Sequence, residues 1–406
     1  MRRRMSSRRY LSAREAAEEL GVSLRTLYAY VSRGMIRSEA AGGRRRRYRA
    51  EDVRRLKERK ERRRRPEDAV EGALSWGTPV MESGITLITD EGFYYRGRDV
   101  VELSRRCGIE EVAALVWVGD ESAAGEIFGF GAPPSVSSIR ETVGGLELPP
   151  LEALQAALPL AAAGDPVAYD LRPDSAARTG GRILRLMAAV ASGGEGTGGV
   201  AGTLCRGWGL QGEGTRRVLD AALVLCADHE LPVSTFAARC AASSGASPYA
   251  AVSAGLAAFG GSRHGGALYL VESFLGEIEA RGDVRGVIGA WFRRGEGVPG
   301  FGHPLYPDGD PRGAELLHRV SGECPGSPAV RLARTVVREV REMVGENPTV
   351  DFALVTLARA LGLPPGAAVA LFAVGRAVGW IGHAIEQYAS GSLIRPRARY
   401  VGEPPA

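Results

Sequence analysis

The chain has 406 residues, of which 45% are hydrophobic and 24% charged, a composition typical of a globular protein with a large buried core. No apolar run approaches the roughly 18 residues needed to span a bilayer, and the arginine-rich start lacks the apolar stretch of a signal peptide. The five cysteines are scattered without a Cys-x-x-Cys pair, so neither a disulfide framework nor a zinc site is indicated. We therefore expect a cytoplasmic protein with no membrane segment and no metal.

Charge is distributed unevenly along the chain, although the formal net charge is only +5. Residues 1–65 contain 23 Lys and Arg against 8 Asp and Glu, a formal charge of +15. Residues 66–406 contain 29 against 39, a formal charge of −10. The change falls at Pro66, so the sequence predicts a separate basic module that ends at residue 65.

The basic module has the pattern of two short helices. Ser12 and Glu15 have the spacing of a capping box at the start of the first helix. Ser23 can cap a second helix that runs from Leu24 to about Ser32. The positions of this second helix that face outward are Arg25, Thr26 and Tyr28.

A basic run follows the two helices and consists of Arg44, Arg45, Arg46 and Arg47. The order helix, turn, helix and basic wing resembles the winged helix-turn-helix of the MerR and excisionase families. This resemblance implies that the second helix enters the major groove of DNA while the wing contacts phosphates. A solvated charged tail is the competing interpretation, and the run from Arg54 to Arg65 fits a solvated linker helix equally well.

Helical periodicity dominates after Pro66. Apolar residues recur at three- and four-residue spacing in the stretches 110–117, 151–158, 181–192, 215–226 and 330–344, and residues 366–388 form a helix that is apolar on nearly all sides. Strand signals are confined to about residues 84–95. The glycine-rich stretch 192–214 lacks a preceding strand and a Gly-Lys-Ser/Thr ending, which favours a connection between helices over a phosphate-binding loop.

Three of the five histidines lie in clusters flanked by glycine or acidic residues. These clusters are Asp228-His229-Glu230, Arg263-His264-Gly265-Gly266 and Gly300-Phe301-Gly302-His303, the last followed by Asp310-Pro311-Arg312. A neutral imidazole beside flexible backbone can donate a hydrogen bond to an enol or take part in proton transfer, and an arginine can hold a carboxylate.

Further motifs accompany the histidine clusters in a fixed order. They are Phe93 to Asp99, Leu225 to Glu230, Ser234 to Arg239, Val350-Asp351-Phe352, Gly375 to Trp380 and Arg395-Pro396-Arg397. From about Gly72 to Gly402, this ordered set resembles the citrate synthase family. The resemblance implies a mainly α, two-domain helical fold with a small N-terminal β-ribbon, here preceded by the winged helix-turn-helix.

The resemblance also implies how the domains are divided. We expect the first part of a large helical domain at residues 66–267, a small domain at 268–355 and the C-terminal part of the large domain at 356–406. Closure of the small domain over the large one would exclude water during the reaction. The expected assembly is a homodimer or a higher oligomer.

The catalytic roles that the resemblance implies fall to three residues. Asp351 would be the base that removes a methyl proton, His264 the donor to the thioester carbonyl, and His303 the group that protonates the ketone. Each residue has a structural alternative. His264 could be a loop histidine with a structural hydrogen bond, and Asp351 could cap a helix that begins at Phe352.

The substrate contacts that the resemblance implies are His229, Arg312, Arg376 and Arg395, with Arg397 as a substitute for Arg395. Arg395 would reach into the site of the other subunit. Arg312 could instead be a turn residue paired with a surface acid. Arg376 lies in the apolar helix, where burial costs several kcal/mol unless an anion neutralises it; a bound carboxylate or an internal partner such as Glu386 would serve.

The chain departs from the family pattern at three positions. Cys226 stands where many citrate synthases have a histidine that supports the thioester pocket. Pro304 and Pro307 stand where the family commonly has cations that contact coenzyme A phosphates. Weaker phosphate binding is expected unless Arg263, Arg293 or Arg294 compensates.

The predicted reaction is the condensation of acetyl-CoA with oxaloacetate to give citrate and free coenzyme A, without a further cofactor. An alternative is 2-methylcitrate synthase, because one extra methylene changes acyl-chain selectivity only modestly. A rival from another class is a transcription regulator whose synthase-like domain senses a metabolite without turnover. The basic module favours the regulator, whereas the set His264, His303 and Asp351 favours catalysis.

Overall fold

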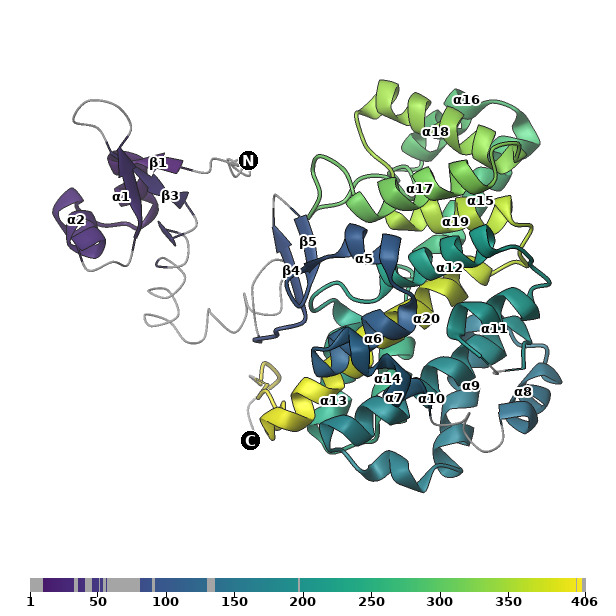
Figure 1. The fold of residues 1–406 in the computed structure, drawn as a ribbon. Helices are drawn as coiled ribbons and strands as arrows, with labels where there is room; N and C mark the ends of the chain where they lie inside the picture. Colours follow the sequence, from purple (N-terminus) through teal and green to yellow (C-terminus); the bar gives the residue numbers. More distant parts are fainter. Residues whose placement is uncertain are drawn as a thin grey trace. The chain divides into compact units, whose positions relative to one another are not determined.

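The protein forms two compact units, Met1–Glu82 and Ser83–Ala406, in a computed structural model (Figure 1). The structure describes residues 10–32, 36–40, 46–50, 52–53, 56, 81–89, 92–129, 136–195, 198–398 and 400–403. The boundary expected after residue 65 and the linker helix considered for residues 54–65 lie largely outside the described residues. That boundary and the division of the second unit into two domains stay predictions.

The first unit is a small helix-turn-helix with a three-stranded antiparallel sheet. Its elements are β1 (Tyr10–Ser12), α1 (Ala13–Glu19), α2 (Leu24–Ser32), β2 (Ser38–Ala40) and β3 (Arg46–Arg49), with strand order β1-β3-β2. The predicted capping box is confirmed, because the Glu15 N–H donates to Ser12 Oγ at 3.3 Å and the Ser12 N–H donates to the Glu15 carboxylate at 2.8 Å. Leu27 and Val53 are fully buried in its core. Strand β1 was not predicted, since three residues carry too little alternation to signal a strand.

The second unit is mainly helical, as predicted. A β-ribbon consists of β4 (Thr86–Thr89), β5 (Gly92–Tyr95) and β6 (Arg98–Asp99). The strand order is β4-β5-β6, and each strand is antiparallel to its neighbour. The helices are α5 (Val100–Arg106), α6 (Ile109–Val118), α7 (Ala124–Gly129), α8 (Val136–Gly144), α9 (Pro150–Ala163), α10 (Pro173–Ser192), α11 (Val200–Gly207), α12 (Glu213–Cys226), α13 (Val233–Ser243), α14 (Pro248–Phe259), α15 (Ala267–Arg281), α16 (Val284–Arg293), α17 (Pro311–Glu323), α18 (Pro328–Val344), α19 (Val350–Ala360) and α20 (Ala367–Ser390).

The predicted helical stretches of the second unit lie within these helices, except that Gly366 is the N-cap residue of α20 and not part of it. The largest difference is α10, which begins at Pro173 rather than near Gly181. The pair Gly180 and Gly181 lowers the helix propensity of this segment, so the sequence pattern did not indicate its first part as helix. A Cβ on Gly180 would lie 2.8 Å from Ile381 and 2.9 Å from Trp117. Close packing therefore requires glycine there, and tertiary contacts override the weak local preference.

Helix α20 forms the centre of the second unit and appears in yellow in Figure 1. It packs against α10, α12, α13 and α14. By length and composition α20 could cross a membrane, but its apolar window is entirely buried inside the protein. No such run was predicted from the sequence, because Arg376 and His383 interrupt the apolar residues.

Glycine allows α20 to approach the segment that carries His229. The Gly379 N–H donates to the Ala227 carbonyl at 2.8 Å. A Cβ on Gly379 would lie 2.6 Å from that carbonyl oxygen and would overlap the carboxylate of Asp228. A Cβ on Gly375 or Gly382 would likewise lie 2.7 Å from a neighbouring atom, so all three glycines of α20 permit close packing.

We expect Gly379→Ala to destabilise the protein by about 1–3 kcal/mol, because the methyl group has no room at this contact. The measurement is urea unfolding followed by circular dichroism. Gly276→Ala in α15 is the matched control, since no neighbouring atom lies within 4 Å of the position that its Cβ would take. The control should be more stable than wild type by about 0.5–1 kcal/mol. If the two substitutions changed the free energy of unfolding equally, the close contact at Gly379 would be contradicted.

Candidate active site

Aromatic rings from three distant segments meet around His229. Its Nε2 lies 2.8 Å from the Tyr306 hydroxyl. The ring centroids of His229 and His303 are 5.5 Å apart, those of His303 and Tyr306 are 4.9 Å apart, and Phe93 of β5 lies 5.6 Å from His229. Burial, followed by the charges of Arg312 and Arg376, holds the pKa of His229 well below its usual value. The ring is therefore neutral at pH 7.

The proton of a neutral His303 ring can be placed from its backbone contact. Nδ1 accepts the N–H of Leu305 at 3.1 Å, so the proton lies on Nε2. Burial and the nearby Arg312 charge lower the pKa of His303. His303 can thus donate from Nε2 to an oxygen while remaining uncharged.

His264 lies in the turn before α15, against the ring of Phe259 at 5.1 Å between centroids. Its Nε2 lies 2.8 Å from Ser234 Oγ. Burial, with a smaller effect of Arg376, lowers the pKa of His264 to about 4. The hydrogen bond that the structural alternative requires is present, and the ring is a neutral group that can still donate. Its catalytic role stays a prediction.

Arg312 and Asp310 form a buried, two-pronged ion pair. Arg312 Nε and a terminal nitrogen donate to the two carboxylate oxygens of Asp310, both at 2.9 Å. The two side chains are 3% and 0% exposed. The alternative of a surface acid is therefore wrong, because the partner is Asp310 itself and it is buried. Asp310 also accepts the Val350 N–H at 3.0 Å, which ties α17 to the start of α19.

Asp351 is the second residue of α19. The helix begins at Val350 with Thr349 as its N-cap residue, so the structural alternative in which Asp351 caps a helix beginning at Phe352 is wrong. Its carboxylate accepts the Thr349 hydroxyl at 3.2 Å. Burial raises the pKa of Asp351, and the charge of Arg312 opposes this shift. A raised pKa makes this carboxylate a stronger base than an exposed aspartate.

Arg376 is 1% exposed in α20. Its Nε donates to the Cys226 carbonyl at 2.8 Å. No carboxylate within the described part of the chain forms an ion pair with it. The internal partner Glu386 is ruled out, because Glu386 pairs with Arg239 at 3.1 Å. Burial lowers the pKa of Arg376, and the charge of the buried Asp228 opposes this shift. A guanidinium without a direct ion pair remains a site for an anion.

The cations expected at the edge of the site are more dispersed. Arg395 lies exposed in the segment after α20, and Arg263 and Arg293 are also exposed. Arg294 stacks on Trp291 at 5.1 Å and lies 3.4 Å from Glu277. Among the described residues, no group of three or more His, Cys, Asp or Glu side chains is arranged to hold a metal ion.

Sequence reasoning missed the residues that orient the histidines. Tyr306, Ser234, Phe93 and Asp310 all contact predicted site residues. Ser234, Phe93 and Asp310 lie inside the ordered motifs, whereas Tyr306 lies between two of them and had no signal. Ser234 is 30 residues from His264, and Tyr306 is 77 residues from His229. Periodicity cannot reveal pairs at such separations.

In the first unit, the predicted DNA contacts divide into exposed and paired residues. Tyr28 is 52% exposed on α2, and Arg46 is exposed on β3. The Thr26 hydroxyl lies 2.9 Å from Ser23 Oγ within the helix cap, so it is less available than predicted. Arg47 pairs with Glu39 at 3.2 Å and stacks over the ring of Tyr10. The side chain of Arg25, and residues 44 and 45, lie outside the described structure.

The second unit is thus a helical protein that gathers neutral histidines, a buried carboxylate of raised pKa and buried arginines around one site. The family model described as citrate synthase, C-terminal domain, matches residues 73–397, and a helix-turn-helix domain model matches residues 10–61. Since the citrate synthase model matches most of this chain, the chain belongs to the citrate synthase family.

Individual relatives agree with this assignment. The chain is 32% identical over 362 residues to the citrate synthase of Haloferax volcanii, an alignment that covers 80% of this chain and 94% of the relative. It is 38% identical over 194 residues to putative citrate synthase 2 of Mycobacterium tuberculosis, which covers 46% of this chain and about half, 52%, of that protein.

Solved structures show the same fold. The citrate synthase of Thermotoga maritima has a TM-score of 0.66 at 26% identity and covers 81% of this chain and 95% of that chain. That of Pyrobaculum aerophilum has a TM-score of 0.70 at 26% identity, with 82% and 92% covered. The predicted fold class is therefore confirmed.

We expect Asp310→Asn to lower the stability of the protein by about 3–5 kcal/mol, because it leaves Arg312 buried without its counter-charge. Thermal unfolding by calorimetry measures this. The matched control is Asp170→Asn, which breaks an aspartate–arginine pair of the same kind with the exposed Arg172. The control should unfold at nearly the wild-type temperature. An equally small effect of Asp310→Asn would contradict a structural role for the buried pair.

Proposed function

We propose that the chain catalyses the condensation of acetyl-CoA with oxaloacetate, followed by hydrolysis of citryl-CoA to citrate and coenzyme A. The observation that carries this proposal is Arg376, a buried guanidinium that forms no direct ion pair with a carboxylate among the described residues. The charge of Asp228 acts on it, but so does the like charge of Arg312. A dicarboxylate substrate would supply a direct ion pair. Family membership and the neutral histidines support the same chemistry.

Carbon–carbon bond formation needs a base, an enolate donor and an acid. In the proposed mechanism Asp351 removes the methyl proton of the thioester. His264 stabilises the resulting enolate by hydrogen bonding to the thioester oxygen. When the Ser234 hydroxyl donates to Nε2, the proton of this neutral ring lies on Nδ1, which is then the donor. His303 donates from Nε2 to the ketone oxygen as the enolate carbon attacks.

Substrate carboxylates would be held by arginine forks, which match their geometry. We assign this role to Arg312 and Arg376, with His229 as a further contact. Arg395 is assigned to the site of a second subunit, which makes the proposed enzyme a dimer at least. Its exposed position after α20 leaves it available for such a contact.

A second candidate reaction uses propionyl-CoA. Two relatives bear the name 2-methylcitrate synthase, one from Shewanella oneidensis at 24% identity and one from Mycobacterium tuberculosis at 28%. One methylene alters selectivity by only about 10- to 200-fold. Parallel turnover with acetyl-CoA and propionyl-CoA decides between the two products.

We further propose that the first unit binds double-stranded DNA. The support is the helix-turn-helix match over residues 10–61, the exposed Tyr28 on α2 and the net charge of +15 over residues 1–65. If the second unit proves inactive with every acyl-CoA, the chain is better described as a DNA-binding metabolite sensor.

Asp351→Asn should lower kcat by about 10²- to 10⁴-fold, because the amide cannot accept the methyl proton. The assay follows oxaloacetate-dependent thiol release from acetyl-CoA and propionyl-CoA. The acidic limb of the wild-type kcat profile should lie above the pKa of an ordinary aspartate, because burial raises the pKa of Asp351.

The matched control is Asp174→Asn. Asp174 is also the second residue of its helix, α10, but it is exposed on the surface. The control should keep wild-type turnover. No thiol release by wild type with either thioester would refute the proposed reaction.

Arg46→Gln should weaken duplex binding and reduce the slope of log K against log salt by about one unit, because one phosphate contact is lost. Arg47→Gln is the comparison. Its effect should be smaller, since Glu39 already offsets the charge of Arg47. Fluorescence anisotropy with a labelled duplex over a salt series measures both. If removing residues 1–65 leaves binding unchanged, the first unit is not the DNA-binding element.

A further inference from the structure

Two prolines, Pro304 and Pro307, lie in consecutive β-turns that begin at His303. The Tyr306 N–H donates to the His303 carbonyl at 3.0 Å, which closes a first turn with Pro304 in its second position. The Gly309 N–H donates to the Tyr306 carbonyl at 3.0 Å, which closes a second turn with Pro307 in its second position. Proline favours this position because its ring already holds φ at about −65°. We call this segment, from His303 to Gly309, the double-proline turn.

The prolines restrict the backbone of the two residues whose side chains reach the candidate site. His303 and Tyr306 each directly precede a proline, and the residue before a proline is confined mainly to extended conformations. Within the first turn, the Leu305 N–H also donates to His303 Nδ1 at 3.1 Å. The rings of His303 and Tyr306 are therefore held close to each other, with centroids 4.9 Å apart.

Asn347, in the loop between α18 and α19, holds the double-proline turn in place. Its side-chain amide donates to the Asp308 carbonyl at 3.2 Å, and its backbone carbonyl accepts the Gly302 N–H at 3.0 Å. Gly309 has a φ of +121°, which favours glycine, and a Cβ there would lie 3.2 Å from the Cβ of Asn347. The turn therefore packs closely against this loop.

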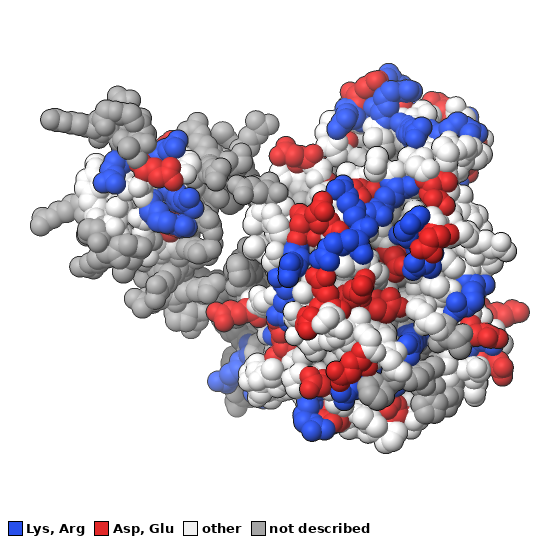
Figure 2. Space-filling view, in the orientation of Figure 1, with Lys and Arg blue, Asp and Glu red and all other residues white. Residues whose placement is uncertain are grey.

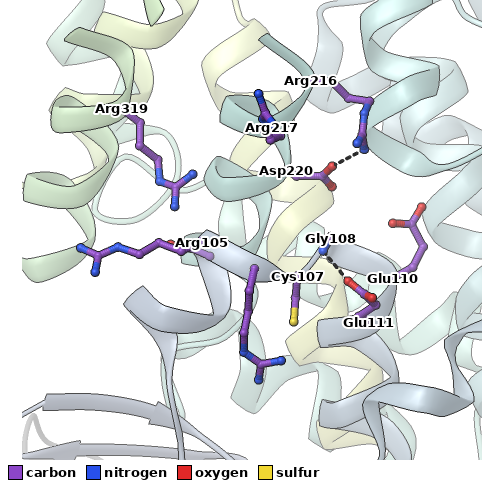
Figure 3. Close-up of a pocket in the computed structure, with 11 residues that line it drawn as sticks. Arg105, Cys107, Gly108, Glu110, Glu111, Arg216, Arg217, Asp220 and Arg319 are labelled. Atoms are coloured by element: carbon purple, nitrogen blue, oxygen red, sulfur yellow. Dashed lines mark hydrogen bonds and ion pairs between the residues drawn. The ribbon is translucent and has the colours of Figure 1, made fainter. Parts of the chain in front are cut away.

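Helix α17 begins at Pro311, shortly after the double-proline turn, and is tied to α5. Glu315 of α17 accepts hydrogen bonds from Arg105 of α5 at 2.9 Å and from Arg319 of its own helix at 2.8 Å. Figure 3 shows both arginines beside a pocket, and Figure 2 shows acidic and basic side chains interspersed on the face where α5 and α17 lie. The two arginines are therefore neutralised within the protein, and the ion pair between α5 and α17 gives the turn a fixed base.

The Tyr306 hydroxyl connects the double-proline turn to His229. It lies 2.8 Å from His229 Nε2, and the guanidinium carbon of Arg312 lies 5.5 Å from the centroid of the Tyr306 ring. Burial raises the pKa of Tyr306 to about 12, and the charge of Arg312 opposes this shift. The phenol keeps its proton at pH 7 and can donate a hydrogen bond to Nε2. The proton of the neutral His229 ring then lies on Nδ1.

We propose that Tyr306 is a positioning residue that fixes the ring and the tautomer of His229 before substrate binds. Pro304 and Pro307 in turn fix Tyr306. His229 then donates from Nδ1 to a carboxylate of oxaloacetate without first having to reorient, which increases affinity. The two prolines thus strengthen oxaloacetate binding at positions where the family commonly has cations for coenzyme A. This inference rests on the proposed function, in which His229 contacts the substrate.

Isothermal titration calorimetry with oxaloacetate, combined with steady-state kinetics, tests the role of Tyr306. Tyr306→Phe should raise the dissociation constant and the KM for oxaloacetate about three- to tenfold, because it removes one hydrogen bond to His229 and keeps the ring. The kcat and the KM for acetyl-CoA should change less than about twofold, since only the binding of oxaloacetate loses an interaction.

The matched control for this substitution is Tyr388→Phe. Tyr388 is half-buried like Tyr306, and its hydroxyl donates to the Ala246 carbonyl at 2.7 Å near the end of α20. Because this hydrogen bond lies outside the candidate site, the control should bind oxaloacetate within about twofold of wild type.

Pro304→Ala/Pro307→Ala tests the role of the prolines. It should raise the dissociation constant of oxaloacetate about two- to fivefold for each proline, because alanine leaves the turns more conformational freedom to lose on binding. In the Tyr306→Phe background the same pair should have less than about a twofold effect, since all three substitutions act through one contact. Pro325→Ala is the matched control, because Pro325 has the second position of a turn between α17 and α18 that a 3.0 Å backbone hydrogen bond closes. This control should bind oxaloacetate as wild type does.

Unchanged oxaloacetate affinity in Tyr306→Phe, beside an active wild type, would overturn this inference and leave the proposed function standing. Fully additive effects of Tyr306→Phe and the proline pair would overturn the claim that the prolines act through Tyr306. A wild type that neither binds oxaloacetate nor releases thiol from either thioester would overturn the proposed function and this inference together.

Discussion

A buried guanidinium that forms no direct ion pair among the described residues is the constraint around which the candidate site is organised. Arg376 is 1% exposed in the central helix, and its Nε donates to the carbonyl of Cys226. Such a group destabilises the unliganded protein unless an anion is supplied. Burial lowers the pKa of His229, and the charges of Arg312 and Arg376 lower it further. The charge of Arg376 thus favours carboxylate binding and helps to keep the imidazole neutral.

Arg312, in contrast to Arg376, has a carboxylate partner within the protein. Arg312 is neutralised by Asp310, and Asp310 also accepts the Val350 N–H beside Asp351. This pair fixes the distance between α17 and the helix that carries the proposed base. Gly379 fixes the distance between α20 and the segment that carries His229, because its backbone N–H donates directly to the carbonyl of Ala227. An ion pair and a close glycine contact thus hold the elements that carry the candidate site residues, and the glycine contact leaves no room for a larger side chain.

The sequence was sufficient for the helical class, the helix-turn-helix with its capping box, and the apolar helix that buries Arg376. Each has a local signal, such as the Ser12–Glu15 spacing or the apolar residues around Gly375. The partners of the predicted residues could not be derived in this way. Ser234 and His264, like Tyr306 and His229, meet only through the tertiary fold. The alternative in which Glu386 pairs with Arg376 is not found, because Glu386 pairs with Arg239 and Arg96 instead.

Equilibrium binding of oxaloacetate to Arg376→Met is the most direct test of the account, with the thermal stability of the unliganded protein recorded in parallel. Methionine fills much of the same space without a charge. The variant should lose affinity for oxaloacetate by about 100-fold or more, while unfolding at a temperature equal to or above that of wild type. Unchanged oxaloacetate affinity in a folded Arg376→Met protein would contradict the claim that this buried charge is the substrate's binding partner.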